Sequence, residues 1–197
     1  MAPEIHLILH PSTTYRRIAA PRVESGAVVL LRRPLLVCLT LGVSVALAAT
    51  GRVTAGLVLG AAACWSLVPA VQMAAFATMM RFTPRPRQLP FSSAADLFFM
   101  GHLGWSLWLL AVAGAAAATF PAGAAWWPQG AATTLLGTAL VPAIVTLRIT
   151  AAYCREVFGL SERRALLATA LYEGLVWGFG VLYAGWAIQL WPRILAL

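Results

Sequence analysis

Four polar side chains that could move protons or bind a solute interrupt long apolar stretches of the sequence. They are Gln72, His102, Arg148 and Glu173. Counted from the arginine-rich end of its stretch, each of Gln72, His102 and Glu173 lies roughly eight residues in, or about 12 Å at the rise of an α-helix. A polar group at such a depth in lipid is costly unless it is paired, protonated or hydrated. The sequence therefore predicts that three helices meet in one polar layer, with Arg148 somewhat shallower as a cation for Glu173.

Two interpretations of this layer remain open. In the first, the polar groups join helices by hydrogen bonds, each worth about 0.6 kcal/mol on average in a membrane protein. In the second, the layer binds a solute or carries protons. The structural interpretation is favoured, because the stretches consist mostly of Ala, Leu and Val and no pair of acidic residues marks a proton path. Asp96 stands apart, near the beginning of its stretch.

Residue patterns of well-defined catalytic, cofactor and metal sites are missing from the sequence. It has no zinc-protease HExxH pair, no GxSxG motif, no P-loop and no dinucleotide-binding glycine motif. We therefore expect no catalytic residues and no cofactor. His6 and His10 have the spacing of paired metal ligands but no nearby acidic or cysteine partner, so we expect no metal site. Cys38, Cys64 and Cys154 are scattered and are expected to be packing residues.

The elements that position the polar residues follow from the composition. Hydrophobic residues make up 61% of the chain, charged residues only 10%, and the mean hydropathy is +0.82. A membrane-spanning helix requires about 20 mostly apolar residues. The stretches that qualify are 34–50, 53–80, 94–118, 130–152 and 165–191. They lack the alternating pattern of barrel strands. We therefore expect an all-α polytopic membrane protein, in which a leader (1–33) precedes a bundle of five transmembrane helices (34–197).

Arginine predicts the orientation of these helices. All 14 basic residues are arginine, and the formal net charge is +8. Twelve of them fall in the leader and near alternate connections, namely Arg16, Arg17, Arg22, Arg32, Arg33, Arg81, Arg85, Arg87, Arg148, Arg155, Arg163 and Arg164. Arg52 and Arg193 lie on the opposite side. Because basic residues accumulate on the cytoplasmic side, the N-terminus should be cytoplasmic and the C-terminus outside. The arginine clusters should then meet anionic lipid headgroups, whereas nothing resembles a nucleic-acid recognition helix.

The leader is predicted to carry a short interfacial helix. On such a helix Tyr15 and Ile18 would face the apolar phase, and Arg16 and Arg17 would point towards the headgroups. Apolar residues on one side and basic residues on the other are typical of helices that lie in the membrane surface. A segment of about 33 residues is also too short to bury a core of its own.

Small residues predict close helix packing. Gly56 with Gly60, and Gly174 with Gly178, each form a pair of small residues four apart, which lets two backbones approach. We expect these four glycines to be helix-packing positions.

Turn residues and prolines predict where the helices turn and bend. Only Gly51 and Arg52 separate the first two stretches, which should form a tight antiparallel hairpin. Pro69 and Pro142 fall inside the second and fourth stretches, where each removes a backbone hydrogen bond and should bend its helix.

Two short phrases resemble those of a known membrane-protein family. The phrases are HPSTTYRRI at 10–18 and GLSERRAL at 159–166, just before the last stretch. With the five apolar stretches, they resemble bacterial members of the Yip family, five-span membrane proteins named for interaction with Ypt/Rab GTPases in eukaryotes. The acidic, tyrosine-containing leader motif of the eukaryotic members is missing, so Rab binding is not implied. The resemblance implies a non-catalytic role in membrane organisation or transport.

The sequence thus leaves two functions to compare. The favoured one is a non-catalytic integral-membrane scaffold or accessory subunit, which packs against other membrane-protein subunits or a second copy of itself. The alternative is a transporter or permease component that uses the polar layer. A scaffold can keep Gln72, His102 and Glu173 mutually paired and dry, whereas a transporter needs them at a water-filled cavity. Short loops and frequent Ala and Arg favour the bacterial inner membrane.

Overall fold

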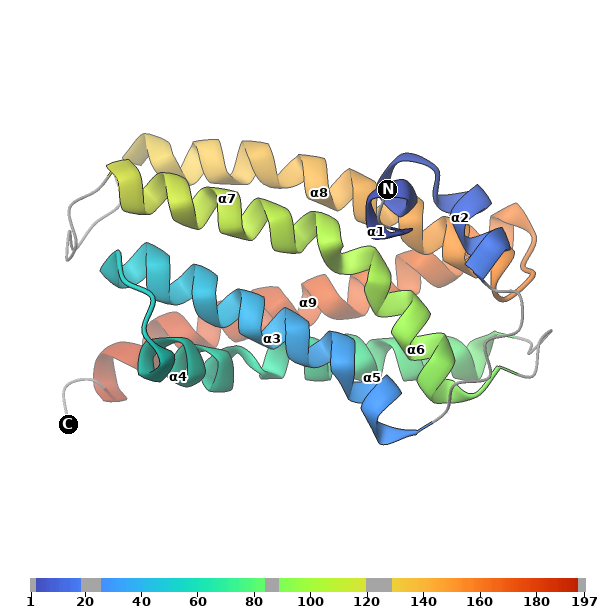
Figure 1. The fold of residues 1–197 in the computed structure, drawn as a ribbon, viewed down its shortest axis with the longest axis horizontal. Helices are drawn as coiled ribbons and strands as arrows, with labels where there is room; N and C mark the ends of the chain where they lie inside the picture. The colour runs from blue at the N-terminus through green and yellow to red at the C-terminus, as the bar shows by residue number, and fades with distance from the viewer. Residues whose placement is uncertain (1–2, 19–25, 84–88, 120–128, 195–197) are drawn as a thin grey trace.

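Every regular element in the described part of the chain is a helix. The structure is a computed structural model that describes residues 3–18, 26–83, 89–119 and 129–194, with the surroundings of the side chains at 5–18, 26–83, 89–119 and 137–183. Within these ranges the elements are α-helices and one short 3-10 helix. Five helices, two of them interrupted, are long and apolar enough to cross a membrane. The predicted all-α bundle is confirmed (Figure 1).

The first two long helices form the predicted hairpin. Helix α3 (Ala27–Thr50) ends at Gly51, whose φ of 64° lies in the left-handed region that glycine adopts without steric cost. The Gly51 N–H donates to the Leu47 carbonyl oxygen at 2.8 Å. Thr54 then caps α4 (Ala55–Trp65), because its side chain accepts a hydrogen bond from the Leu57 N–H. The hairpin prediction is confirmed, and the turn sets α3 and α4 side by side.

The first helix begins earlier than the sequence predicted. It starts at Ala27 rather than at 34, so Arg32 and Arg33 lie within α3 instead of in the leader. The start of the helix was predicted directly after Arg33, the last arginine of the cluster. A helix can, however, continue beyond the apolar part of the membrane. Long arginine side chains can reach polar surroundings from within a helix. Residues 27–33 are therefore part of the first long helix.

Two of the five long helices are interrupted. The second consists of α4 and α5 (Leu67–Phe82), which join at Ser66. Pro69 has no N–H for the Trp65 carbonyl, so the hydrogen-bond ladder breaks one turn before it. The third consists of α6 (Phe91–Phe99), the 3-10 helix η1 (Met100–His102) and α7 (Leu103–Thr119). The sequence did not predict this second interruption.

The remaining long helices are continuous. Helix α8 (Gln129–Glu156) continues through Pro142 without a break. Helix α9 (Glu162–Ile194) begins after a short connection in which Gly159 has a φ of 65°. Both helices extend beyond the predicted stretches at 130–152 and 165–191, because their polar first and last turns continue the helix outside the apolar part.

The leader forms two short helices that pack on the bundle. They are α1 (Pro3–Leu9) and α2 (Pro11–Ile18). Tyr15 is fully buried, and its hydroxyl donates to the Leu97 carbonyl oxygen at 3.3 Å. Arg16 pairs with Glu156 at the end of α8, with 3.2 Å between Nη2 and Oε1. The apolar side predicted for this helix at Tyr15 is thus covered by the bundle itself, because protein encloses the ring.

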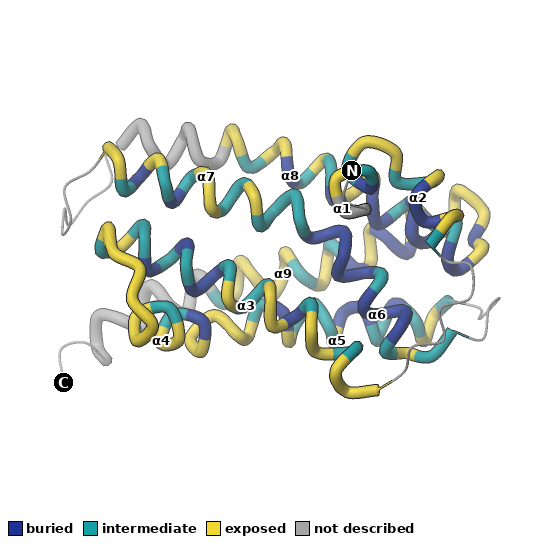
Figure 2. Tube along the Cα trace, in the orientation of Figure 1, coloured by how far each residue is buried: buried dark blue, intermediate teal, exposed yellow. Residues whose placement is uncertain are grey.

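The two ends of the bundle differ in packing. We call the end where α2, the start of α6 and the end of α8 meet the leader end, and the end at Gly51 the hairpin end. The buried residues gather at the leader end (Figure 2). Phe76 is fully buried there, with its ring centroid 4.6 Å from that of Phe98 and 6.1 Å from that of Tyr153. Between this core and the hairpin end, the helices enclose open space.

Candidate functional site

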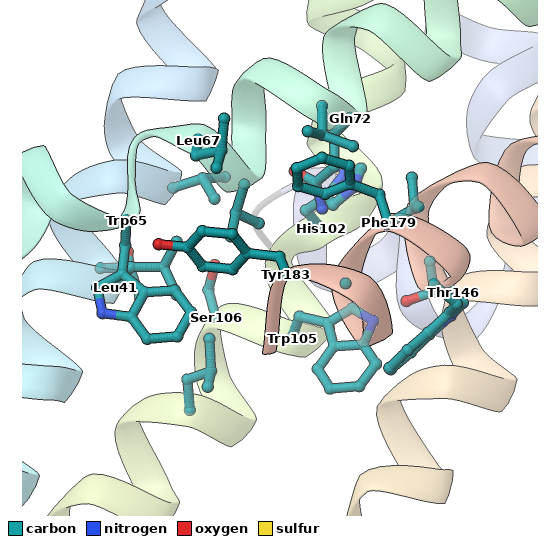
Figure 3. A pocket seen from close by; sticks show the side chains of 18 of the residues that line it. Leu41, Trp65, Leu67, Gln72, His102, Trp105, Ser106, Thr146, Phe179 and Tyr183 are labelled. Atoms are coloured by element: carbon teal, nitrogen blue, oxygen red, sulfur yellow. The ribbon is translucent and has the colours of Figure 1, made fainter. Parts of the chain in front are cut away.

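A half-open cavity of about 690 Å³ lies between the helices, next to the core of the leader end. Residues from α3, α4, α5, η1, α7, α8 and α9 line it, and the lining is mostly apolar. Its size falls within the range of about 300 to 1,000 Å³ that small-molecule sites occupy. Mostly apolar walls with a few polar groups are also typical of such sites. The cavity is therefore the candidate functional site (Figure 3).

Three of the four polar residues predicted to form a layer line this cavity. They are Gln72 from α5, His102 from η1 and Glu173 from α9. His102 Nε2 lies 3.3 Å from the Tyr172 hydroxyl, and the Trp177 Nε1–H donates to Glu173 Oε2 at 3.1 Å. Within the described residues, His102 and Glu173 thus bond to side chains of α9 and not to one another.

Several oxygen atoms of the lining residues have no hydrogen-bond partner. In the part of the chain that the structure describes, they are Gln72 Oε1, Thr146 Oγ1 and Glu173 Oε1. Leaving a buried polar atom unpaired costs about 1 to 3 kcal/mol. A bundle whose polar layer served only to join helices would pair these atoms with each other. With His102 Nδ1, the lining residues hold four of the seven buried side-chain atoms without a partner in the described ranges, the others being on Ser44, Trp108 and Thr169. The cavity is thus a place where another molecule can complete hydrogen bonds.

Aromatic rings form much of the remaining wall. The ring centroids of Trp105 and Trp177 lie 5.6 Å apart, and those of Trp65 and Tyr183 lie 6.5 Å apart. Tyr183 also stacks on Phe179, with 6.1 Å between centroids. Figure 3 shows the rings of Trp65, Trp105, Phe179 and Tyr183 around the polar side chains of Gln72 and His102. Both faces of the cavity can therefore hold a large apolar or aromatic body.

Arg148 does not take part in the cavity. It is exposed on α8 and is absent from the lining. The exposed residues Leu140, Val141, Ile144 and Leu147 mark the outward stripe of the helix, and Arg148 follows on the same stripe. Thr146, on the buried side, is the residue of α8 that lines the cavity. The depth of Arg148 within its apolar stretch could not predict which side of α8 faces the cavity.

The four glycines predicted to pack helices have no close neighbour from another helix in the part of the chain that the structure describes. A Cβ added at Gly56, Gly60, Gly174 or Gly178 would meet no other atom within 4 Å. The close helix contact lies instead at Gly42 on α3, where an added Cβ would sit 2.5 Å from the Val58 carbonyl oxygen. The predicted glycine faces are thus open on the outside of the bundle.

A second polar cluster, at the leader end, was not predicted. Asp96 is only 5% exposed, and both its oxygens lie 2.6 Å from nitrogens of Arg32, Nε and Nη2. Arg33 Nε donates to the same carboxylate at 3.0 Å. The sequence contained the signal, because Asp96 is the one acidic residue near the start of an apolar stretch and the arginines lie on the same predicted side of the membrane. This cluster links α3 to α6, and two arginines pair with the carboxylate of Asp96.

The histidines of the leader form no metal site in the described residues. His6 Nδ1 lies 2.9 Å from the Thr14 hydroxyl oxygen, and the rings of His6 and His10 are 5.2 Å apart. Within the ranges described above, no three His, Cys, Asp or Glu side chains form a group that could hold a metal ion.

Comparisons with other proteins give no further guide to the chain. No protein-family model, no curated protein and no solved structure matches it.

Proposed function

We propose that the protein is a non-catalytic component of a membrane transport system and that the cavity binds its solute. The single observation that carries this proposal is that Gln72, Thr146 and Glu173 each bring to one cavity an oxygen without a partner among the described residues. Cavity walls of this kind favour the transporter over the scaffold, because a scaffold gains nothing from unpaired polar groups around open space.

The proposal includes a location and an orientation. Twelve arginines on one side against two on the other support an N-terminus in the cytoplasm and a C-terminus outside, and the composition supports the inner membrane of a bacterium. A reporter fused after Arg87 and one fused after Leu197 should report opposite compartments. The same compartment for both fusions would contradict five crossings. Membership of the Yip family is proposed on the two short phrases and the five helices alone.

Water in the cavity is the property that tests the proposed function. Cys64 lines the cavity and is exposed, whereas Cys154 is buried in the core of the leader end. Alkylation requires the thiolate, which forms in water and not in a dry apolar space. We expect iodoacetamide to label Cys64 in nanodiscs much faster than Cys154, as mass spectrometry of the two peptides would measure.

Two glycines on α9 serve to test whether iodoacetamide reaches Cys64 through the cavity. Gly180 lines the cavity and Gly178 does not, and a Cβ added at either would meet no atom within 4 Å in the described part of the chain. Gly180→Phe should therefore fill part of the cavity and slow the labelling of Cys64 several-fold. Gly178→Phe should leave the rate unchanged. Equal rates in the two variants, or no labelling of Cys64, would contradict a solute cavity and support the scaffold.

The scaffold remains the second candidate because of one observation. The paired glycines on α4 and α9 are open on the outside of the bundle, where a helix of another subunit or of a second copy could approach them. Cross-linking of the protein in its native membrane would test for such a partner. Loss of the cross-link in Gly60→Leu, with Gly180→Phe as the control inside the cavity, would support this role.

A further inference from the structure

Charge is the first property of the cavity that selects among possible solutes. Glu173 is the acidic residue of the lining, and no Arg or Lys lines the cavity in the described part of the chain. The exposed position of Arg148 on α8 removes the cation that the sequence had suggested for Glu173. A carboxylate within a membrane-spanning helix is costly unless it is protonated, paired or hydrated. A positively charged solute would supply the opposite charge.

The hydrogen-bonding groups beside Glu173 also favour a positively charged solute. Glu173 Oε1 and Gln72 Oε1 are acceptors, and neither has a partner in the described part of the chain. The Trp177 Nε1–H already donates to the other oxygen of Glu173. These two acceptors suit a solute that carries positive charge or N–H donors. An anionic solute, such as a fatty acid, would place like charges together.

The aromatic rings of the cavity wall also suit a positively charged solute. Trp105 and Trp177 lie 5.6 Å apart next to Glu173, and Tyr183 stacks on Phe179 further along α9. The face of an aromatic ring carries negative charge density and attracts cations within about 6 Å. The same rings offer an apolar surface to the rest of a solute. Inorganic cations would make poor use of this surface, whereas a cation with an apolar body would contact all of it.

We propose that the cavity binds a lipophilic organic cation, with its positive group at Glu173 and its apolar body against Trp105, Trp177 and Tyr183. This inference rests on the proposed solute cavity and names the class of its solute. Glu173 acts as the residue that selects charge, and the aromatic rings provide most of the contact area. A neutral solute of the same shape would leave the carboxylate unpaired.

Two ions of nearly identical shape and opposite charge provide the test. Tetraphenylphosphonium is the cation and tetraphenylborate the anion, and their binding would be measured with purified protein in nanodiscs and corrected with empty nanodiscs. The wild type should bind the cation at least about tenfold more tightly than the anion, the ratio that about 1.4 kcal/mol of charge pairing gives. Glu173→Gln should remove this preference, because the amide keeps the shape but not the charge. Glu156→Gln, which changes a carboxylate outside the lining, should retain it.

A measurement on the unaltered protein guards against a variant that fails to fold. Tetraphenylphosphonium should slow the labelling of Cys64 by iodoacetamide, whereas the same concentration of tetraphenylborate in the bilayer should not. If both ions bind and protect equally, or if the anion binds better, the inferred solute class is wrong while the cavity still binds solutes. If neither ion binds and Gly180→Phe labels like Gly178→Phe, the proposed function itself fails.

Discussion

The core of the leader end and the cavity share α5, η1, α8 and α9, but they differ in how their polar groups are paired. In the core, the Tyr153 hydroxyl donates to the Ala94 carbonyl oxygen at 2.8 Å, and the Tyr15 hydroxyl donates to that of Leu97. At the cavity, Gln72, Thr146 and Glu173 each keep an oxygen without a partner in the described part of the chain. Unpartnered side-chain atoms in the described part of the chain also occur outside the cavity, on Ser44, Trp108 and Thr169, but four of the seven lie on its lining residues. Unpaired groups at the cavity mark the part of the molecule that a solute completes.

The largest expected difference between the two regions concerns the loss of an aromatic ring. Phe76 is fully buried in the core, whereas Phe179 at the cavity is 38% exposed. Phe76→Ala should lower the free energy of unfolding by about 3 to 5 kcal/mol, because the packed neighbours cannot close the space. Phe179→Ala should cost less than about 1 kcal/mol. Denaturant titration in micelles would measure both values, and equal losses would show that the cavity wall is packed as tightly as the core.

The next difference concerns charge. Asp96→Asn removes the negative charge that Arg32 and Arg33 share, and it should lower the free energy of unfolding by about 2 kcal/mol, since hydrogen bonds to charged groups contribute about 1.5 to 3 kcal/mol. Glu156→Gln is the matched control. Its partner Arg16 has a side chain that is 71% exposed, so the loss should stay below about 1 kcal/mol. If Asp96→Asn were as mild as the control, the cluster would not hold α3 to α6.

A smaller effect is expected where the hairpin passes the cavity. Gly42→Ala would press a methyl group against the Val58 carbonyl oxygen and Ala62, and overpacking of this kind costs about 1 to 3 kcal/mol. Gly60→Ala has open space and should stabilise the protein by up to about 1 kcal/mol, because alanine favours a helix more than glycine does. Thermal unfolding of both variants would compare them. A loss at Gly60 as large as that at Gly42 would place a helix contact at the predicted glycine face.

The smallest effect is a dependence on pH at the leader end. Burial raises the pKa of Tyr15, so the folded protein favours its neutral hydroxyl. The contribution of Tyr15 to stability is therefore complete below the ordinary tyrosine pKa of about 10 and is lost as the pH rises above it. The wild type should be more stable than Tyr15→Phe by about 1 kcal/mol at neutral pH, the usual contribution of one hydrogen bond. Unfolding measured from pH 8 to about 11.5 should show this advantage disappear above about pH 10, and a constant difference would contradict burial of the hydroxyl.

The positions of the long helices could be predicted from the sequence, because length and hydropathy determine which segments can cross a membrane. Periodicity and depth also brought Gln72, His102 and Glu173 to one level. They could not give rotation about a helix axis, which decides that Thr146 and not Arg148 reaches the cavity. Periodicity and depth also could not predict the 3-10 turn at His102, because the stretch 94–118 contains no proline that would mark it. Tertiary packing determines this turn. Gly101 there lies so close to Ile149 that an added Cβ would be 2.7 Å from Cγ2.

The carboxylate of Asp96 has a consequence for the order in which the protein is assembled. Arg32 precedes Asp96 by 64 residues, so α3 and α4 emerge from the ribosome before the partner of the arginine exists. Until α6 is in place, the arginines of α3 lack the carboxylate of Asp96. Arrival of the third helix then supplies this fixed charge and joins α6 to the first hairpin. The third helix is thus the first that an ion pair can fasten to α3.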